Sequence, residues 1–258
     1  MLKLWLIYDA ERKARNQWLI DHYRELGPRF GFEIDLVMAE DPLPVEAPCA
    51  AIVRCVAPSL REQLERRGIQ SFNSAELARI ANDKWLTYNY LREQGVQVMP
   101  TALASEHHFD FPFVQKPRDG HGGTGVRLVS APGEGSSSSA LIVQELCDTP
   151  GVDLRVYLLG GEILATMLRT SDRDFRSNFS LGGKAEHYCL STTERAHIKT
   201  VIESAPLLAT GLIGVDFISH DGAWVVNEIE DVVGARMLYQ HTDIDIVEKH
   251  LAFIAQAV

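Results

Sequence analysis

The chain has 258 residues, of which 46% are hydrophobic and 23% charged, and its formal net charge is −10 at pH 7. Its length suits one large domain or two to three closely packed lobes, and its negative charge excludes nucleic acid as a partner. No apolar run approaches the roughly 20 residues that span a bilayer, which excludes a membrane partner. The opening MLKLWLIYDAERKAR becomes charged too early for a signal peptide, so we expect a cytoplasmic protein.

The first 80 residues alternate strand patterns with helix patterns. The predicted strands are residues 2–8, 32–38, 51–55 and 69–72, and the predicted helices are residues 11–26 and 59–67. Gly27-Pro28 ends the first helix and Gly68 ends the second. This alternation indicates a small parallel α/β lobe.

The stretch after residue 80 has a different character. Asn82 is the predicted N-cap of the helix DKWLTYNYLREQ, which stops at Gly95. Between residues 111 and 145 the runs FPFVQK, VRLV and LIVQEL are strand-like, with a Gly-rich loop and the turn GEGSSSS between them. We therefore expect a small antiparallel lobe here.

The last part of the chain reads as two hairpins and two helices. The hairpins reverse at Gly160-Gly161 and at Asp221-Gly222, both of which suit tight turns. The helices are predicted at residues 192–209 and 243–256. The expected order of the whole chain is α/β, then mostly β, then α+β, in three lobes.

The four cysteines form no CxxC pair. They are Cys49, Cys55, Cys147 and Cys189, and each lies in or beside an apolar, strand-like segment. This pattern favours small buried side chains over metal ligands or a nucleophile.

The segment VQKPRDGHGGTGVRLV carries the first set of candidate site residues. A strand ending in Lys116 enters a loop that contains Gly120, Gly122, Gly123 and Gly125. Glycines allow consecutive backbone N–H groups to face one anion, and the lysine adds a positive charge, so the segment suits a polyphosphate. It is not a Walker A loop, because GxxxxGK[ST] is absent and a strand follows. A Gly-rich turn without a ligand is the alternative.

The second set is acidic and lies on the Asp221-Gly222 hairpin. Glu228 and Glu230 are two residues apart and so face the same side of a strand, and the hairpin brings Asp216 alongside them. Three carboxylates together need a cation or basic residues, and oxygen ligands suit Mg²⁺. The alternative is a solvated acidic face.

The third set contains arginines and an amide, in DLRVY, TMLRTS and DFRSN. They are Arg155, Arg169, Arg176 and Asn178. The arginine fork recognises carboxylate or phosphate at two points, as a site for a charged substrate beside a polyphosphate requires. Taken singly, each arginine is also an ordinary surface ion-pair residue.

These segments together resemble the ATP-grasp superfamily, and within it the RimK type, the ligases that add glutamate to a ribosomal protein's C-terminus. The resemblance runs from about Asn82 to the C-terminus through NDKWLTYNYLREQGVQVMPT, PFVQKPRDGHGGTGVRLV, LIVQEL, GVDLRVYLLGGEILATMLR, DFRSNFSLGG, GVDFI and NEIEDVVGARMLYQHTDIDI. It implies the ATP-grasp fold, with a pre-ATP-grasp α/β lobe (1–80), a β-rich lid lobe (81–147) and an α+β lobe with the metal site (148–258).

The resemblance also implies roles for single residues. Lys84 and Lys116 contact ATP phosphates, Lys116 lies near the adenine as well, and Arg169, Arg176 and Asn178 face the reacting phosphate and carboxylate. The remaining nucleotide contacts are assigned to Gly122, Gly123, Gln144, Glu145, the Leu146 backbone, Asp153 and Arg155. Two Mg²⁺ ions, with Mn²⁺ as the alternative metal, are assigned to Asp216, Glu228 and Glu230.

The expected activity is ATP-dependent joining of a carboxylate to an amine through an acyl phosphate, with an amino acid such as glutamate added to a peptide, a protein or a small amine. The alternatives are a phosphotransferase and a non-catalytic nucleotide-binding module.

The chain departs from the family's pattern at the metal motif. Glu230 stands where the family usually has asparagine, and DVVGARM replaces the Pro-Gly that often follows. The identity of the acid and the amine, and whether the chain forms a homo-oligomer, are left open.

Overall fold

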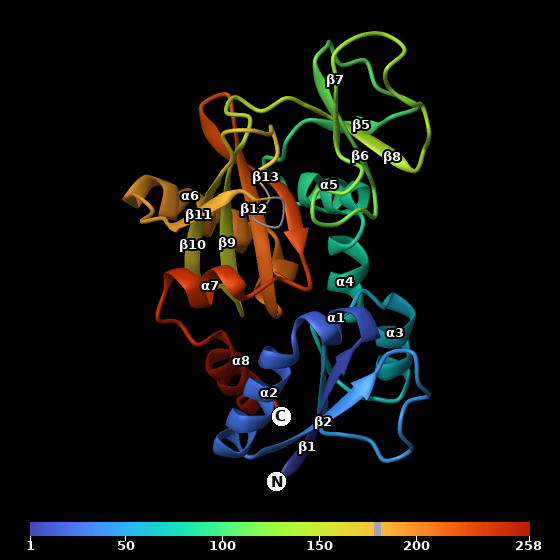
Figure 1. The fold of residues 1–258 in the computed structure, drawn as a ribbon, viewed down its shortest axis with the longest axis vertical. Coiled ribbons are helices and arrows are strands. Elements are labelled where there is room, and N and C mark those ends of the chain that lie inside the picture. Colours follow the sequence, from blue (N-terminus) through green and yellow to red (C-terminus); the bar gives the residue numbers. More distant parts are fainter. Residues whose placement is uncertain (178–181) are drawn as a thin grey trace.

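Three β-sheets, each built from a consecutive part of the chain, organise the molecule (Figure 1). The computed structural model describes residues 1–177 and 182–258. The N-terminal sheet is parallel, with strand order β2-β1-β3-β4. Its strands are β1 (Leu2–Tyr8), β2 (Phe32–Met38), β3 (Ala50–Val53) and β4 (Ser71–Phe72).

Three helices and a short 3₁₀ turn connect these strands. They are α1 (Ala10–Arg15), α2 (Gln17–Leu26), η1 (Gly27–Phe30) and α3 (Pro58–Arg66). The single helix predicted for residues 11–26 is wrong, because the chain leaves the helical conformation at Asn16, whose side chain donates to the Arg12 carbonyl at 2.7 Å. Trp18 of α2 is 41% exposed, whereas Leu19 and Tyr23 of the same helix are buried.

Two helices lead from the first sheet to the second. They are α4 (Ala75–Ala81), which the sequence analysis missed, and α5 (Lys84–Glu93). The predicted cap of α5 is off by one position: the Asp83 carboxylate accepts from the amides of Trp85 and Leu86, whereas Asn82 ends α4.

The second sheet is small and antiparallel, as predicted, with order β5-β8-β6-β7. Its strands are β5 (Thr101–Leu103), β6 (Phe113–Pro117), β7 (Arg127–Val129) and β8 (Leu141–Glu145). Before β5, Val98 pairs with Val226 of the third sheet. The connection into this lobe therefore runs beside the strand that carries Glu228 and Glu230.

The third sheet is antiparallel, with order β11-β10-β9-β12-β13. Its strands are β9 (Val152–Leu159), β10 (Glu162–Thr170), β11 (Lys184–His187), β12 (Leu212–His220) and β13 (Ala223–Glu230). Both predicted hairpins are confirmed, and the residues at both turns have positive φ: Gly160 and Gly161 at the first, Asp221 and Gly222 at the second.

Within the described ranges, four helical segments accompany this sheet. They are α6 (Thr192–Ser204), η3 (Pro206–Ala209), α7 (Arg236–His241) and α8 (Ile246–Ala255). The helix predicted for residues 192–209 thus ends earlier, and Pro206 begins a separate 3₁₀ turn because proline cannot continue the hydrogen bonding of a helix. No helix in the described ranges is both long and apolar enough to cross a bilayer.

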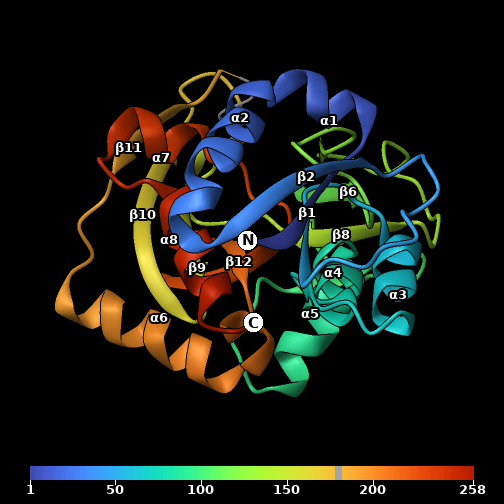
Figure 2. The ribbon, with the colours of Figure 1, turned by 90° about the horizontal axis from the view of Figure 1, so that it is seen from below.

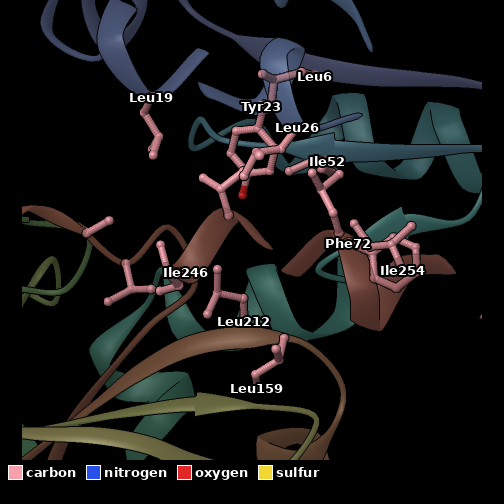
Figure 3. Close-up of a cluster of buried hydrophobic side chains, with 14 of the residues drawn as sticks. Leu6, Leu19, Tyr23, Leu26, Ile52, Phe72, Leu159, Leu212, Ile246 and Ile254 are labelled. Carbon is pink, nitrogen blue, oxygen red and sulfur yellow. The ribbon is translucent and has the colours of Figure 1, made fainter. Parts of the chain in front are cut away.

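The largest apolar core joins the first sheet to the third (Figure 3). In the close-up, Leu6, Ile52 and Phe72 of the N-terminal lobe lie on the same cluster as Leu159 and Leu212 of the C-terminal lobe. Helix α8 packs on α2, and both views place the two chain ends near each other (Figures 1 and 2). The two lobes therefore share one buried interior, on which the site rests.

Candidate active site

One cleft brings together most of the predicted site residues. It lies between the second and third sheets, under the loop that joins β6 to β7, and has an empty volume of about 800 Å³ open to solvent. The predicted residues that line it are Lys84, Lys116, Gly122, Gly123, Gln144, Glu145, Leu146, Asp153, Arg169, Arg176, Asp216 and Glu228. Arg155 and Glu230 do not line it, and Asn178 lies outside the described residues.

The wall on the side of the second sheet is formed by β6 and β8. Lys116 is 5% exposed, and its Nζ donates to Asn227 Oδ1 on β13 at 3.0 Å. Burial lowers the pKa of Lys116 to about 8, although the charge of Glu228 acts in the opposite direction. On β8, the Gln144 side chain donates to the Thr101 hydroxyl at 2.9 Å and is thereby fixed against β5.

Two side chains hold the Gly-rich loop, one from its own lobe and one from the C-terminal lobe. Lys84, at the start of α5, donates to the Gly120 carbonyl, and Arg176 Nη1 donates to the Gly123 carbonyl at 2.9 Å. Gly122 and Gly123 have φ values of 62° and 79°, which disfavour any residue with a side chain. The Arg176 guanidinium is also paired with Asp174 at 2.7 Å. Arg176 therefore both holds the loop through Gly123 and lines the cleft.

A buried network of two acids and two arginines, joined by hydrogen bonds, forms the floor of the cleft. Arg169 donates to both Asp153 oxygens at 2.6 Å and to Asp216 at 2.8 Å. Arg155 donates to both Asp216 oxygens at 2.5 and 2.7 Å. Burial alone raises the pKa of Asp216, but the charges of Arg155 and Arg169 outweigh burial and bring that pKa to about 2.

Glu230 lies behind the cleft wall. It accepts from Arg155 Nη1 at 2.7 Å, and its side chain is 26% exposed. Arg155 therefore links two of the predicted metal ligands, and its own pKa is raised by Asp216 and Glu230 in spite of its burial. Arg155 and Glu230 thus belong to this network of acids and arginines, but neither lines the cleft.

Glu228 is a partly exposed acid on β13 that lines the cleft. Its side chain is 19% exposed and pairs with Lys84 Nζ at 3.1 Å. A β-bulge lies here: Asp216 pairs with Glu228, and the next pair is Phe217 with Val226, which leaves Asn227 without a partner on β12. Asn227 and Glu228 thus both line the cleft, although strict alternation would point them to opposite faces.

The donor set fits Mg²⁺ in its chemistry, because carboxylate and amide oxygens of Asp216, Asn227 and Glu228 face the cleft. In residues 1–177 and 182–258 no three histidine, cysteine or acidic side chains form a metal-binding group. Arginines and a lysine compensate the acids instead. The charges balance, with four acids (Asp153, Asp216, Glu228, Glu230) against four bases (Lys84, Lys116, Arg155, Arg169).

Several residues that line the cleft were absent from the sequence-based set: Thr124, Cys147, Ser177 and Asn227. Cys147 lies just after β8, beyond Leu146, and is half-buried, whereas Cys189 is exposed. The expectation that all four cysteines are buried is therefore wrong for Cys189. Asn227 could have been noticed as a polar neighbour of Glu228 within an apolar strand.

Comparisons with known proteins agree on one family. Residues 81–254 match the family model of the RimK-like ATP-grasp domain. The chain is 25% identical over 257 residues to the glutamate–LysW ligase ArgX of Sulfolobus acidocaldarius, covering 88% of this chain and 90% of the relative. It is 32% identical over 169 residues to an uncharacterized protein of Mycoplasma genitalium, covering 62% of this chain. The match covers only 58% of the Mycoplasma genitalium protein and 60% of its Mycoplasma pneumoniae homologue.

Solved structures show the same fold at low sequence identity. D-cycloserine synthetase DcsG superposes with a TM-score of 0.74 at 17% identity and covers 99% of both chains. The RimK domain ATP-grasp protein from Sphaerobacter thermophilus superposes with a TM-score of 0.72 at 20% identity, covering 97% of this chain and 98% of that one. The predicted fold class, ATP-grasp with α/β and α+β parts, is confirmed.

Proposed function

Since the chain belongs to the RimK-like ATP-grasp family, we propose that it is an ATP-dependent ligase that joins a carboxylate to an amine. The observation that carries this proposal is the meeting of Lys84, Lys116 and Glu228 in one cleft under a Gly-rich loop. Two lysines and backbone N–H groups suit a polyphosphate, and the acids beside them suit its magnesium. The three lobes with bounds near residues 80 and 147 are part of the same proposal.

The nucleotide lies in this proposal against β8, with the adenine beside Gln144, Glu145 and the Leu146 backbone. Lys84 and Lys116 neutralise the phosphates, and Gly122 and Gly123 allow the loop to approach them closely. Asp153 and Arg155 act on the nucleotide indirectly, because Asp153 orients Arg169 and Arg155 orients Asp216. Asp216, Glu228 and Glu230 hold Mg²⁺, as two ions or with Mn²⁺ in its place. The metal supplies charge neutralisation on the transferring phosphoryl group.

The reaction takes place in two steps. A carboxylate oxygen of the first substrate attacks the γ-phosphorus, the bond to the β-phosphate oxygen breaks, and ADP leaves. The nitrogen of a neutral amine then attacks the acyl carbon, the carbon–oxygen bond to phosphate breaks, and an amide and inorganic phosphate form with loss of a proton from nitrogen. The protein positions both substrates and provides no nucleophile of its own.

The substrates we propose are an amino acid such as glutamate and a peptide, a protein or a small amine. Relatives named glutamate–LysW ligase and probable alpha-L-glutamate ligase support this choice. Arg169, Arg176 and Asn178 are the residues proposed to face the reacting groups. Arg176 is the better candidate for direct contact, because its side chain is 27% exposed, whereas that of Arg169 is 4% exposed and is paired with Asp153 and Asp216.

A substrate panel tests the proposal. ADP release is measured with ATP, MgCl₂ and pairs drawn from amino acids and short acidic peptides, and the products are weighed by mass spectrometry. A product with the mass of two substrates less water supports the ligase. A stable phosphorylated product formed without amine would favour a phosphotransferase, and ATP binding without turnover would favour a non-catalytic module. A cytoplasmic location remains a prediction.

A further inference from the structure

Asn73, which directly follows β4, joins the N-terminal lobe to both strands of the hairpin β12–β13. Its side-chain oxygen accepts from the Leu212 amide at 2.9 Å and its Nδ2 lies 2.9 Å from the Leu212 carbonyl. Asn73 thus pairs with the first residue of β12 as a neighbouring strand would. The same Nδ2 lies 3.0 Å from the carbonyl and 2.9 Å from the carboxylate of Asp231, directly after β13. Asn73 is 4% exposed, so these bonds are shielded from water.

Asp231 is held by two further side chains of the N-terminal half. Its carboxylate pairs with Arg61 of α3 at 3.0 Å, and both side chains are fully buried. Asn82 Nδ2 donates to the second carboxylate oxygen at 3.2 Å. Because both oxygens of Asp231 accept hydrogen bonds from fixed partners, the main chain after Glu230 has little freedom to move.

These contacts lie at the open end of a hairpin that carries three important acids. Strand β12 carries Asp216, and β13 carries Glu228 and Glu230 immediately before Asp231. Resting on the function proposed above, we propose that Asn73, supported by the Arg61–Asp231 pair, is a positioning residue. It fixes the two strand ends relative to each other and thereby sets the spacing of the carboxylates that receive Mg²⁺.

A purely stabilising role accounts poorly for the polar character of this junction. The surrounding interface is apolar, with Phe72 and Leu212 in the cluster of Figure 3. A buried ion pair gives little net stability over apolar side chains of similar volume, whereas in several proteins buried polar groups fix a single arrangement of the groups that they join. The junction therefore provides alignment beyond what the neighbouring apolar contacts supply.

Gly211 offers a test that leaves every charge in place. A Cβ at Gly211 would lie 1.8 Å from Asn73 Oδ1, so Gly211→Ala forces the Asn73 side chain away from Leu212. Gly234→Ala is the matched control, because no atom lies within 4 Å of a Cβ there and its φ is not in the left-handed region. The measurement is ATP binding by calorimetry over a series of MgCl₂ concentrations, with circular dichroism as the check of folding.

For Gly211→Ala we expect the MgCl₂ concentration at half-maximal ATP binding to rise about tenfold or more, the size typical of lost support around a metal ligand. At saturating MgCl₂ the ATP affinity should stay near that of the wild type, and Gly234→Ala should match the wild type throughout. Should Gly211→Ala fail to fold, Asn73→Ala, which removes atoms rather than adding them, is measured in the same way.

A folded Gly211→Ala or Asn73→Ala variant with the wild-type MgCl₂ dependence would overturn the positioning role and leave the proposed function intact. A loss of ATP affinity that no MgCl₂ concentration restores would also overturn it, since it would indicate general disruption. If the wild type itself binds ATP without any MgCl₂ dependence, the proposed function is contradicted and the positioning role with it.

Discussion

Arg155 and Asp216 lie directly opposite each other on β9 and β12, and the guanidinium donates to both carboxylate oxygens, at 2.5 and 2.7 Å. Arg169 adds a further bond to Asp216 at 2.8 Å. Both oxygens of a predicted metal ligand are therefore engaged by arginines. A cation that binds Asp216 has to compete with, or share, these two positive groups.

The competition is tested with Arg155→Met. Removing the guanidinium leaves Asp216 and Glu230 without their shared partner, so the free energy of unfolding should fall by about 3–5 kcal/mol. MgCl₂ should then raise the Tm of Arg155→Met more than that of the wild type, because the uncompensated acids attract the cation. Arg195→Met, at an exposed position on α6, is the control and should behave as the wild type. Equal MgCl₂ shifts in all three proteins would contradict the competition.

Glu228→Gln should abolish turnover while the fold is kept. The substitution removes the charge of an acid that lines the cleft, with little change in volume, and its partner Lys84 keeps its bond to the Gly120 carbonyl. We expect the rate of ADP release to fall by at least about 100-fold, with a change in unfolding free energy below about 1 kcal/mol. Glu162→Gln, at an exposed position, serves as the control. Turnover within about twofold of the wild type would remove Glu228 from the metal site.

Lys116 should make ATP binding pH-dependent. Its pKa of about 8 in the free protein means that it is charged below that pH and loses its charge above it. ATP phosphates favour the charged form, so the Kd for ATP should rise as the pH increases from about 7 to about 9. In Lys116→Met the Kd should be higher at every pH and nearly constant over this range. A wild-type Kd that does not change over the same range would show that Lys116 makes no charge contact with the nucleotide.

Cys147 provides a readout that is independent of catalysis. It lines the cleft beside Leu146, and burial raises the pKa of its thiol, so alkylation should be slow. Mg-ATP should slow it further by covering the thiol. Exposed Cys189 serves as the internal reference, and both peptides are quantified by mass spectrometry after iodoacetamide treatment. Equal alkylation of Cys147 with and without Mg-ATP would place the nucleotide elsewhere.

His250 should make the fold sensitive to acid. It is 2% exposed and hydrogen-bonded to the Tyr23 hydroxyl at 2.8 Å, and burial, assisted by the charge of Arg54, lowers its pKa to about 3. The unfolded chain binds a proton at this residue below about pH 6.5, whereas the folded chain does not, so stability is lost as the pH falls from there.

The expected slope from His250 is about 1.4 kcal/mol per pH unit between about pH 6 and about pH 4. In His250→Leu this contribution should be absent, whatever the constant cost of losing the Tyr23 bond. Urea unfolding at several pH values measures the difference between the two proteins. Parallel stability curves would show that His250 is protonated equally in the folded and unfolded states.

The elements with strong local signals were predictable. Strands 2–8 and 32–38 were predicted with the bounds that the structure has, because apolar runs and flanking turn residues define them. The hairpin turn at Asp221-Gly222 was equally clear from its turn chemistry. Helix α4 was missed, although Ser74 caps it, because its 7 residues are too few for a clear helical periodicity.

The contacts that shape the site could not be predicted from local sequence patterns. The bulge that turns Asn227 into the cleft interrupts the alternation on which strand predictions rest. Arg61 and Asp231 are 170 positions apart, and nothing in either neighbourhood indicates the other. The pairing of Asp216 with two arginines likewise depends on strands that become neighbours only in the folded sheet. The residue types of the site were therefore predictable, whereas their pairings were not.

The most direct test of ligation through an acyl phosphate is the origin of the oxygen in the released phosphate. Turnover is run in ¹⁸O-labelled water with the substrate pair that gives the highest rate of ADP release, and the phosphate is analysed by mass spectrometry. We predict phosphate without ¹⁸O, because its new oxygen comes from the substrate carboxylate, together with one amide product for each ADP. Phosphate that carries one ¹⁸O for each ADP would show attack by water on ATP and would contradict the account.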